Sequence, residues 1–193
     1  MVGMGSSCLC NRKVFQMLIE LKYNLIDIDE WKDLYRRVRS KEIPCEKFGY
    51  GIKVSTKYLS SIPDVRLFPY FFFLISNRRN REFPIHVDGI PGKQAASLNW
   101  GLEGCNEQSP TEFYEPTKDI IWKDLDGSFF MDNTEDTVLT HTNIIYDNKG
   151  YLFRSDMLHR GYTNVDKRVV VKWELEYNEW NTACREFSNR NYI

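Results

Sequence analysis

The chain has 193 residues, of which 42% are hydrophobic and 27% are charged, and its formal net charge is −1. This balance is typical of one globular domain, and a chain of this length buries roughly 70% of the surface that its unfolded form exposes, so its core needs no disulfide or structural metal. The near-neutral charge gives no overall attraction to nucleic acid, and no apolar run approaches the ~20 residues of a membrane-spanning helix, so we expect no membrane association.

The cysteines indicate a reducing compartment. There are five of them, an odd number, and they form no CxxC pair. Glu20 and Lys22 interrupt the N-terminal apolar stretch, so we expect no secretory signal. These features predict a cytoplasmic protein, in the host cytoplasm if the chain is viral.

The N-terminal part of the chain has helical patterns. Apolar residues at helical spacing predict an amphipathic helix over residues 12–24, and a second helix follows, with Asp29 as its candidate N-cap. The buried stripe of the second helix would consist of Trp31, Leu34, Tyr35 and Val38. We therefore expect residues 12–66 to form a helical support.

From residue 45 onward, short β-rich runs alternate with turn residues. Strands are predicted over residues 70–76, 83–88, 96–102, 112–114, 137–146, 151–154 and 168–177. Many short strands at near-regular spacing favour an antiparallel sandwich or barrel. The prediction is one mainly β domain over residues 1–193, with its core at 67–177 and a C-terminal tail at 178–193.

The three histidines can be considered one by one. His86 and Asp88 form an H-x-D pair, and residues i and i+2 of a strand point to the same face. His159 follows 73 residues later, and Arg168 lies nine residues after that. Two histidines and one carboxylate match a facial iron site with open positions, and a buried arginine is suited to clamp a carboxylate. His141 has no carboxylate partner at such spacing, so we interpret it as a structural or surface residue.

This order of residues resembles the Fe(II)/2-oxoglutarate-dependent oxygenases, and in particular small oxygenase-like proteins of phage and marine microbes. Residues 83–89 are similar to the first metal-ligand strand of the family, and residues 96–102 and 111–114 to its next two strands. The resemblance covers about residues 70–176, and the N-terminal helices are not matched by motif.

The resemblance implies a double-stranded β-helix, a cupin-like jelly roll with the N-terminal helices packed on one sheet. It implies that His86, Asp88 and His159 bind Fe(II), and that Arg168 binds the far carboxylate of 2-oxoglutarate. The implied activity is a dioxygenase that uses O2, converts 2-oxoglutarate to succinate and hydroxylates a substrate. The primary substrate is unknown, since a protein side chain, a nucleic acid and a small molecule all stay open, and so does the oligomeric state.

Asn99 and Tyr114 are further candidates for cosubstrate binding. Asn99 has two possible functional roles, to donate a hydrogen bond to 2-oxoglutarate or to orient a metal ligand. The alternative is a structural hydrogen bond to a neighbouring loop. Tyr114 either bonds the far carboxylate or packs in the core.

The sequence leaves two possibilities for which face of the last predicted strand points into the cavity. We expect Val169, Val171, Trp173 and Leu175 to face the helices, which leaves Arg168 in the cavity. The reverse arrangement would place Lys167 there.

Three arginines, Arg78, Arg79 and Arg81, precede the first ligand strand. They either attract an anionic substrate or form a solvated turn. Glu174 stands where base-demethylating members of the family carry a second arginine, which disfavours that branch.

Two alternatives to the oxygenase remain: a cupin-like metalloenzyme that does not use 2-oxoglutarate, and a non-catalytic jelly-roll binding module.

Overall fold

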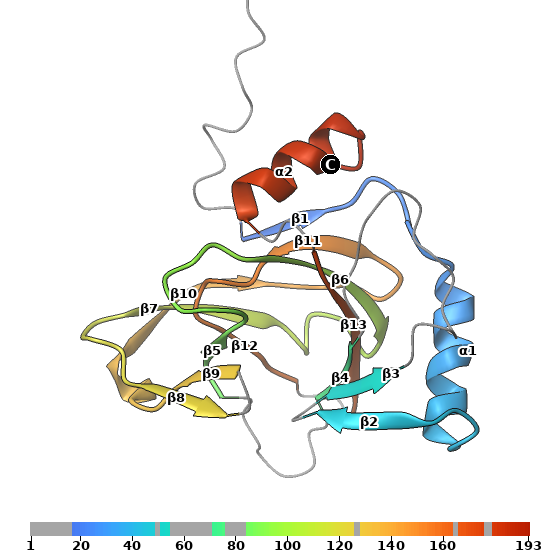
Figure 1. Cartoon of the computed structure of the whole chain (residues 1–193), viewed down its shortest axis with the longest axis horizontal. Coiled ribbons are helices and arrows are strands. Elements are labelled where there is room, and N and C mark those ends of the chain that lie inside the picture. Colours follow the sequence, from blue (N-terminus) through green and yellow to red (C-terminus); the bar gives the residue numbers. More distant parts are fainter. Residues whose placement is uncertain are drawn as a thin grey trace, which may run out of the picture.

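The structure is a computed structural model, and it describes residues 17–48, 51–54, 71–75, 84–125, 128–163, 166–175 and 179–193. In this part of the chain the strands form two sheets, and every strand pair is antiparallel (Figure 1). The mainly β prediction is therefore confirmed.

The first sheet has seven strands in the order β1 (Leu18–Glu20), β11 (Gly150–Arg154), β6 (Ala96–Glu103), β13 (Arg168–Glu174), β4 (Phe71–Ile75), β3 (Gly51–Val54) and β2 (Cys45–Phe48). The second has six, in the order β10 (Thr137–Asn143), β7 (Thr111–Pro116), β12 (His159–Gly161), β5 (His86–Val87), β9 (Ser128–Met131) and β8 (Trp122–Leu125). A short 3-10 helix, η3 (Thr134–Asp136), precedes β10. The strands β1, β2, β3, β8, β9 and β12 are not among those predicted.

One face of β13 packs against helix α1 (Ile28–Arg39). Trp173 is fully buried there, and its ring lies edge-on to the rings of Trp31 of α1, at 4.7 Å, and Trp100 of β6, at 4.8 Å. Val169 and Val171 belong to the same core cluster. This is the predicted assignment of faces, and it turns the alternate residues of β13 towards the second sheet.

The first predicted helix is wrong for its described residues. Leu18–Glu20 form β1, which pairs with β11, and residues 1–16 lie outside the described part. Ile19 joins the core cluster with its neighbour Leu152, whereas Leu18 packs with Phe153 on the other face. A short apolar stretch fits a helix and a strand equally well, and here pairing with β11 decides.

The second predicted helix is confirmed. The four expected residues form the buried face of α1, but the N-cap is Asp27 and not Asp29. The Asp27 Oδ1 accepts hydrogen bonds from the backbone N–H groups of Asp29, at 3.0 Å, and Glu30, at 3.2 Å. Asp29 instead lies in the first turn, where a negative charge favours the helix dipole.

Replacing Asp27 with alanine should therefore lower the free energy of unfolding by about 1 kcal/mol, because it removes the side-chain acceptor of two N–H groups in the first turn of α1. Urea titration followed by circular dichroism measures this change. Asp27→Asn keeps the acceptor and should lose much less. Equal losses in the two variants would contradict the capping role.

The predicted C-terminal tail contains a helix. Residues Trp180–Asn189 form helix α2, which lies beside β1 (Figure 1) and buries Trp180, Ala183, Cys184 and Phe187 in the main core cluster. The backbone N–H of Lys22 donates to the carbonyl of Tyr192 at 2.8 Å, which ties the segment after α2 to the chain that follows β1. Likewise, residues 12–66 contain β1, β2 and β3 besides α1, so this stretch is not a purely helical support. Neither helix within the described ranges has the length and apolar character needed to cross a membrane.

Candidate metal centre

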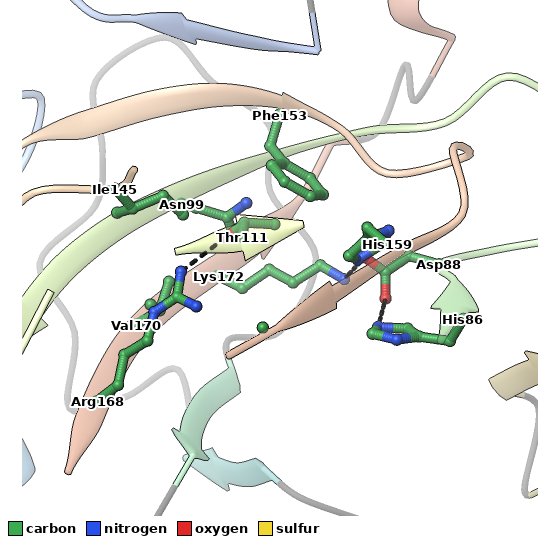
Figure 2. Close-up of a pocket in the computed structure, with 11 residues that line it drawn as sticks. His86, Asp88, Asn99, Thr111, Ile145, Phe153, His159, Arg168, Val170 and Lys172 are labelled. Atoms are coloured by element: carbon green, nitrogen blue, oxygen red, sulfur yellow. Dashed lines mark hydrogen bonds and ion pairs between the residues drawn. The ribbon is translucent and has the colours of Figure 1, made fainter. Parts of the chain in front are cut away.

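Three side chains converge at the edge of the cavity between the sheets. His86 of β5 and His159 of β12 lie directly opposite each other in an antiparallel pair, and their ring centroids are 4.3 Å apart. Asp88 follows β5, where its backbone N–H donates to the carbonyl of Ser155 at 2.8 Å. The three offer ligand atoms that all lie within 4.8 Å of one another (Figure 2). The structure thus brings together the predicted trio.

Backbone carbonyls fix the orientation of both imidazole rings. The Nδ1 of His86 lies 2.9 Å from the carbonyl oxygen of Pro84, and the Nδ1 of His159 lies 2.7 Å from that of Met157. A carbonyl only accepts, so each Nδ1 carries the hydrogen and each Nε2 keeps its lone pair. The Nε2 atoms of His86 and His159 lie 3.8 and 3.6 Å from the carboxylate oxygens of Asp88.

The electrostatics of the site favour the ligand form of each group. Burial lowers the pKa of His86 and lowers that of His159 to about 3, so both imidazoles stay neutral. Burial alone would raise the pKa of Asp88, but the ammonium of Lys172 beside the carboxylate outweighs this effect and holds the pKa well below its ordinary value. Two neutral imidazoles and one carboxylate are a donor set that fits Fe(II) or a similar divalent metal.

The trio opens into a cavity of about 70 Å³ that receives side chains from both sheets. Its walls include the predicted Asn99 of β6 and Arg168 of β13, both of which are buried. Ile145, Phe153 and Val170 supply apolar surface. The cavity therefore joins the three ligands to a buried arginine.

Arg168 is a buried cation without an acidic partner in the described part of the chain. Its Nη1 donates to the carbonyl of Pro110 at 3.0 Å and its Nη2 to Oγ1 of Thr111 at 2.8 Å, while its Nε has no hydrogen-bond acceptor among the described residues. Burial lowers the pKa of this guanidinium, although arginine still keeps its charge. A buried guanidinium charge is costly unless it is paired, so an anion bound in the cavity would stabilise Arg168.

Lys167 lies on the other side of β13. Its Nζ is 2.6 Å from Glu103 and lies over the ring of Tyr35, 5.4 Å from the centroid. The structure therefore places Arg168, and not Lys167, in the cavity.

Tyr114 is not brought to this site. Its hydroxyl donates to Glu112 at 2.6 Å, the same carboxylate that Arg160 contacts at 2.6 Å, and its side chain does not line the cavity. Its contact with a cosubstrate carboxylate stays a prediction. His141 is exposed on β10, in agreement with the surface interpretation.

Sequence reasoning missed Thr111 and Lys172. Thr111 orients Arg168 from β7, and the ammonium of Lys172 lies 2.5 Å from Oδ2 of Asp88. Nothing in the local pattern reveals either contact, although Lys172 shares the alternation of Arg168. The three arginines before the first ligand strand lie outside the described residues.

Cys105 packs behind β13, and its thiol donates to the carbonyl of Val169 at 3.2 Å. Burial raises the pKa of this thiol to about 11. At pH 8 it should therefore resist alkylation, because only the thiolate reacts. Peptide mass spectrometry after iodoacetamide treatment should find the exposed Cys45 modified and Cys105 modified only in denaturant. Equal labelling of Cys45 and Cys105 in the native protein would contradict this packing.

Comparisons with known proteins point to the fold. No family model matches the sequence, and no curated protein matches it either. Among solved structures, the chain is similar to the epimerase SnoN in complex with Fe3+, alpha ketoglutarate and nogalamycin RO, with a TM-score of 0.53 and 14% identity over 86% of this chain and 80% of that one. It is also similar to the non-heme alpha ketoglutarate dependent carbocyclase SnoK from nogalamycin biosynthesis, with a TM-score of 0.50 and 10% identity over 82% and 78% of the two chains. The likeness shows that the fold is shared.

Proposed function

We propose that this protein is a non-haem Fe(II)- and 2-oxoglutarate-dependent dioxygenase that hydroxylates its substrate, built on a double-stranded β-helix. One observation carries the proposal: the two histidines and Asp88 share a cavity with Arg168, a buried cation without an acidic partner among the described residues. The likeness in fold to the epimerase SnoN, solved with Fe3+ and alpha ketoglutarate, and to the non-heme alpha ketoglutarate dependent carbocyclase SnoK supports the proposal.

Each residue of the cavity has a separate task in this proposal. His86, Asp88 and His159 hold the metal, with the Nε2 atoms oriented by the carbonyls of Pro84 and Met157. Three protein ligands leave room for a cosubstrate and for oxygen. When bound, Fe(II) and 2-oxoglutarate supply the oxidising chemistry and yield succinate.

The other residues bind the cosubstrate and keep water out. Arg168 takes the far carboxylate, with its guanidinium already oriented by Pro110 and Thr111. Phe153 lies edge-on to the His159 ring at 4.9 Å and, with Val170, covers the site with apolar surface. Asn99 offers an amide to the same cavity.

Turnover without a primary substrate tests the proposal. Given Fe(II), 2-oxoglutarate and oxygen, the protein should release succinate slowly, and anionic chelators that mimic 2-oxoglutarate should stop the release. The absence of succinate, in protein that also fails to bind 2-oxoglutarate, would contradict the proposal and favour a non-catalytic module.

We also propose a cytoplasmic location. Cys45, Cys105 and Cys184 are free thiols, as expected for a protein of a reducing compartment.

A further inference from the structure

Lys172 lies at a position that is rare for a lysine. Its side chain is 7% exposed in the middle of β13, and its Nζ lies 2.5 Å from Oδ2 of Asp88 (Figure 2). Lysine is almost never buried unless it is paired, so this contact accounts for the direction of the side chain. It also means that the ammonium and a metal ion would compete for one carboxylate.

The same face of β13 carries a second cation. Arg168, Val170 and Lys172 alternate along the strand and all line the cavity. The Cα atoms of the two cationic residues are roughly 13 Å apart on an extended strand. The guanidinium of Arg168 contacts Thr111, whereas the ammonium of Lys172 reaches the metal ligands. The cavity therefore has a cation at each end and apolar Val170 between them.

The charges of the cavity are unbalanced. Among the described residues that line it, Asp88 is the only acid, whereas Arg168 and Lys172 are both cations. A divalent metal adds two more positive charges in a buried place, where an excess of charge is costly. A dicarboxylate offsets this excess at both ends, with one carboxylate on Arg168 and the other beside the metal and Lys172.

We propose that Lys172 is a second cosubstrate-binding residue that exchanges partners. In the metal-free protein its ammonium takes the place of the metal on Asp88. In the loaded protein it pairs with the carboxylate of 2-oxoglutarate that lies beside the metal. This inference rests on the proposed function. It also gives the order in which the two ligands bind, because the metal displaces Lys172 from Asp88 before 2-oxoglutarate enters.

The exchange predicts opposite effects on the two ligands when the charge is removed. In Lys172→Met the metal no longer competes with an ammonium, so metal should bind about tenfold more tightly. The same variant should bind 2-oxoglutarate at least about tenfold more weakly once metal is present, the scale of one lost charge-assisted hydrogen bond.

Anaerobic calorimetric titration measures both constants, with Mn(II) as a redox-stable metal probe and 2-oxoglutarate added to the Mn(II)-loaded protein. Lys172→Gln, which is neutral but still polar, provides a second variant if the methionine protein folds poorly. Lys167→Met is the matched control, since this neighbouring lysine pairs with Glu103 outside the cavity, and it should leave both constants unchanged. In the metal-free state Lys172→Met should also unfold at a lower temperature than wild type, and Mn(II) should raise its unfolding temperature by more.

Only constants that move in opposite directions support the inference. Weaker binding of both ligands would mean that Lys172 merely orients Asp88, and unchanged 2-oxoglutarate binding would mean that it does not contact the cosubstrate. Each of these results overturns the exchange while the proposed function stands. A wild-type protein that binds neither Mn(II) nor 2-oxoglutarate would instead overturn the proposed function itself.

Discussion

Asp88→Ala is expected to abolish metal loading and, with it, succinate release. Asp88 is the only carboxylate among the described residues of the cavity, and without it two neutral imidazoles must hold a divalent ion. Loss of a partner that merely supports a ligand costs roughly 10–100-fold in metal affinity, so loss of a ligand should cost more. Metal titration of the purified variant measures the effect.

The same substitution should destabilise the metal-free protein, because it leaves the buried Lys172 without its contact to Asp88. Breaking a buried ion pair costs about 3 kcal/mol or more in the free energy of unfolding. Asp136→Ala is a suitable control, since Asp136 pairs with Lys118 at 2.7 Å away from the cavity. Near-normal metal affinity in Asp88→Ala would exclude Asp88 as a ligand.

Arg168→Ala should weaken 2-oxoglutarate binding by about 1.5–3 kcal/mol, which corresponds to at least a tenfold higher Kd, while metal binding survives. The reason is that Arg168 is held by Pro110 and Thr111, whereas the residues proposed to hold the metal are His86, Asp88 and His159. Titration of 2-oxoglutarate into metal-loaded protein gives the Kd directly.

Lys167→Ala is the control for this prediction, because Lys167 begins the same stretch of chain but pairs with Glu103. If Lys167→Ala weakened 2-oxoglutarate binding and Arg168→Ala did not, the faces of β13 would be assigned in reverse. Arg168→Lys should recover part of the affinity, since it keeps the charge but loses the two-pronged geometry.

The candidate ligands could be predicted from sequence because their spacing carries geometric information. An H-x-D pair on a strand places both side chains on one face, and the third ligand then needed only a histidine on another strand. The inward-pointing face of β13 was predicted from the clean alternation of its residues and from the need of two predicted N-terminal helices, of which only α1 is found, for an apolar sheet face. The edge-on contact between the rings of Trp173 and Trp31 agrees with this reasoning.

The errors arise where long-range pairing overrides local pattern. Met17, Leu18 and Leu21 fit a helical period, but pairing with β11 makes a strand of Leu18–Glu20. The helix α2 was missed although Trp180, Ala183, Cys184 and Phe187 recur at helical spacing. The contacts of Thr111 and Lys172 join different strands and could not be read from either strand alone.

The most direct test of the central claim is anaerobic addition of Fe(II) and then 2-oxoglutarate, followed by visible absorption. A weak charge-transfer band should appear only when both are present, saturate at one 2-oxoglutarate per protein and be lost in Asp88→Ala. A protein that binds Fe(II) at this site yet gives no band and no heat of binding with 2-oxoglutarate would contradict the account.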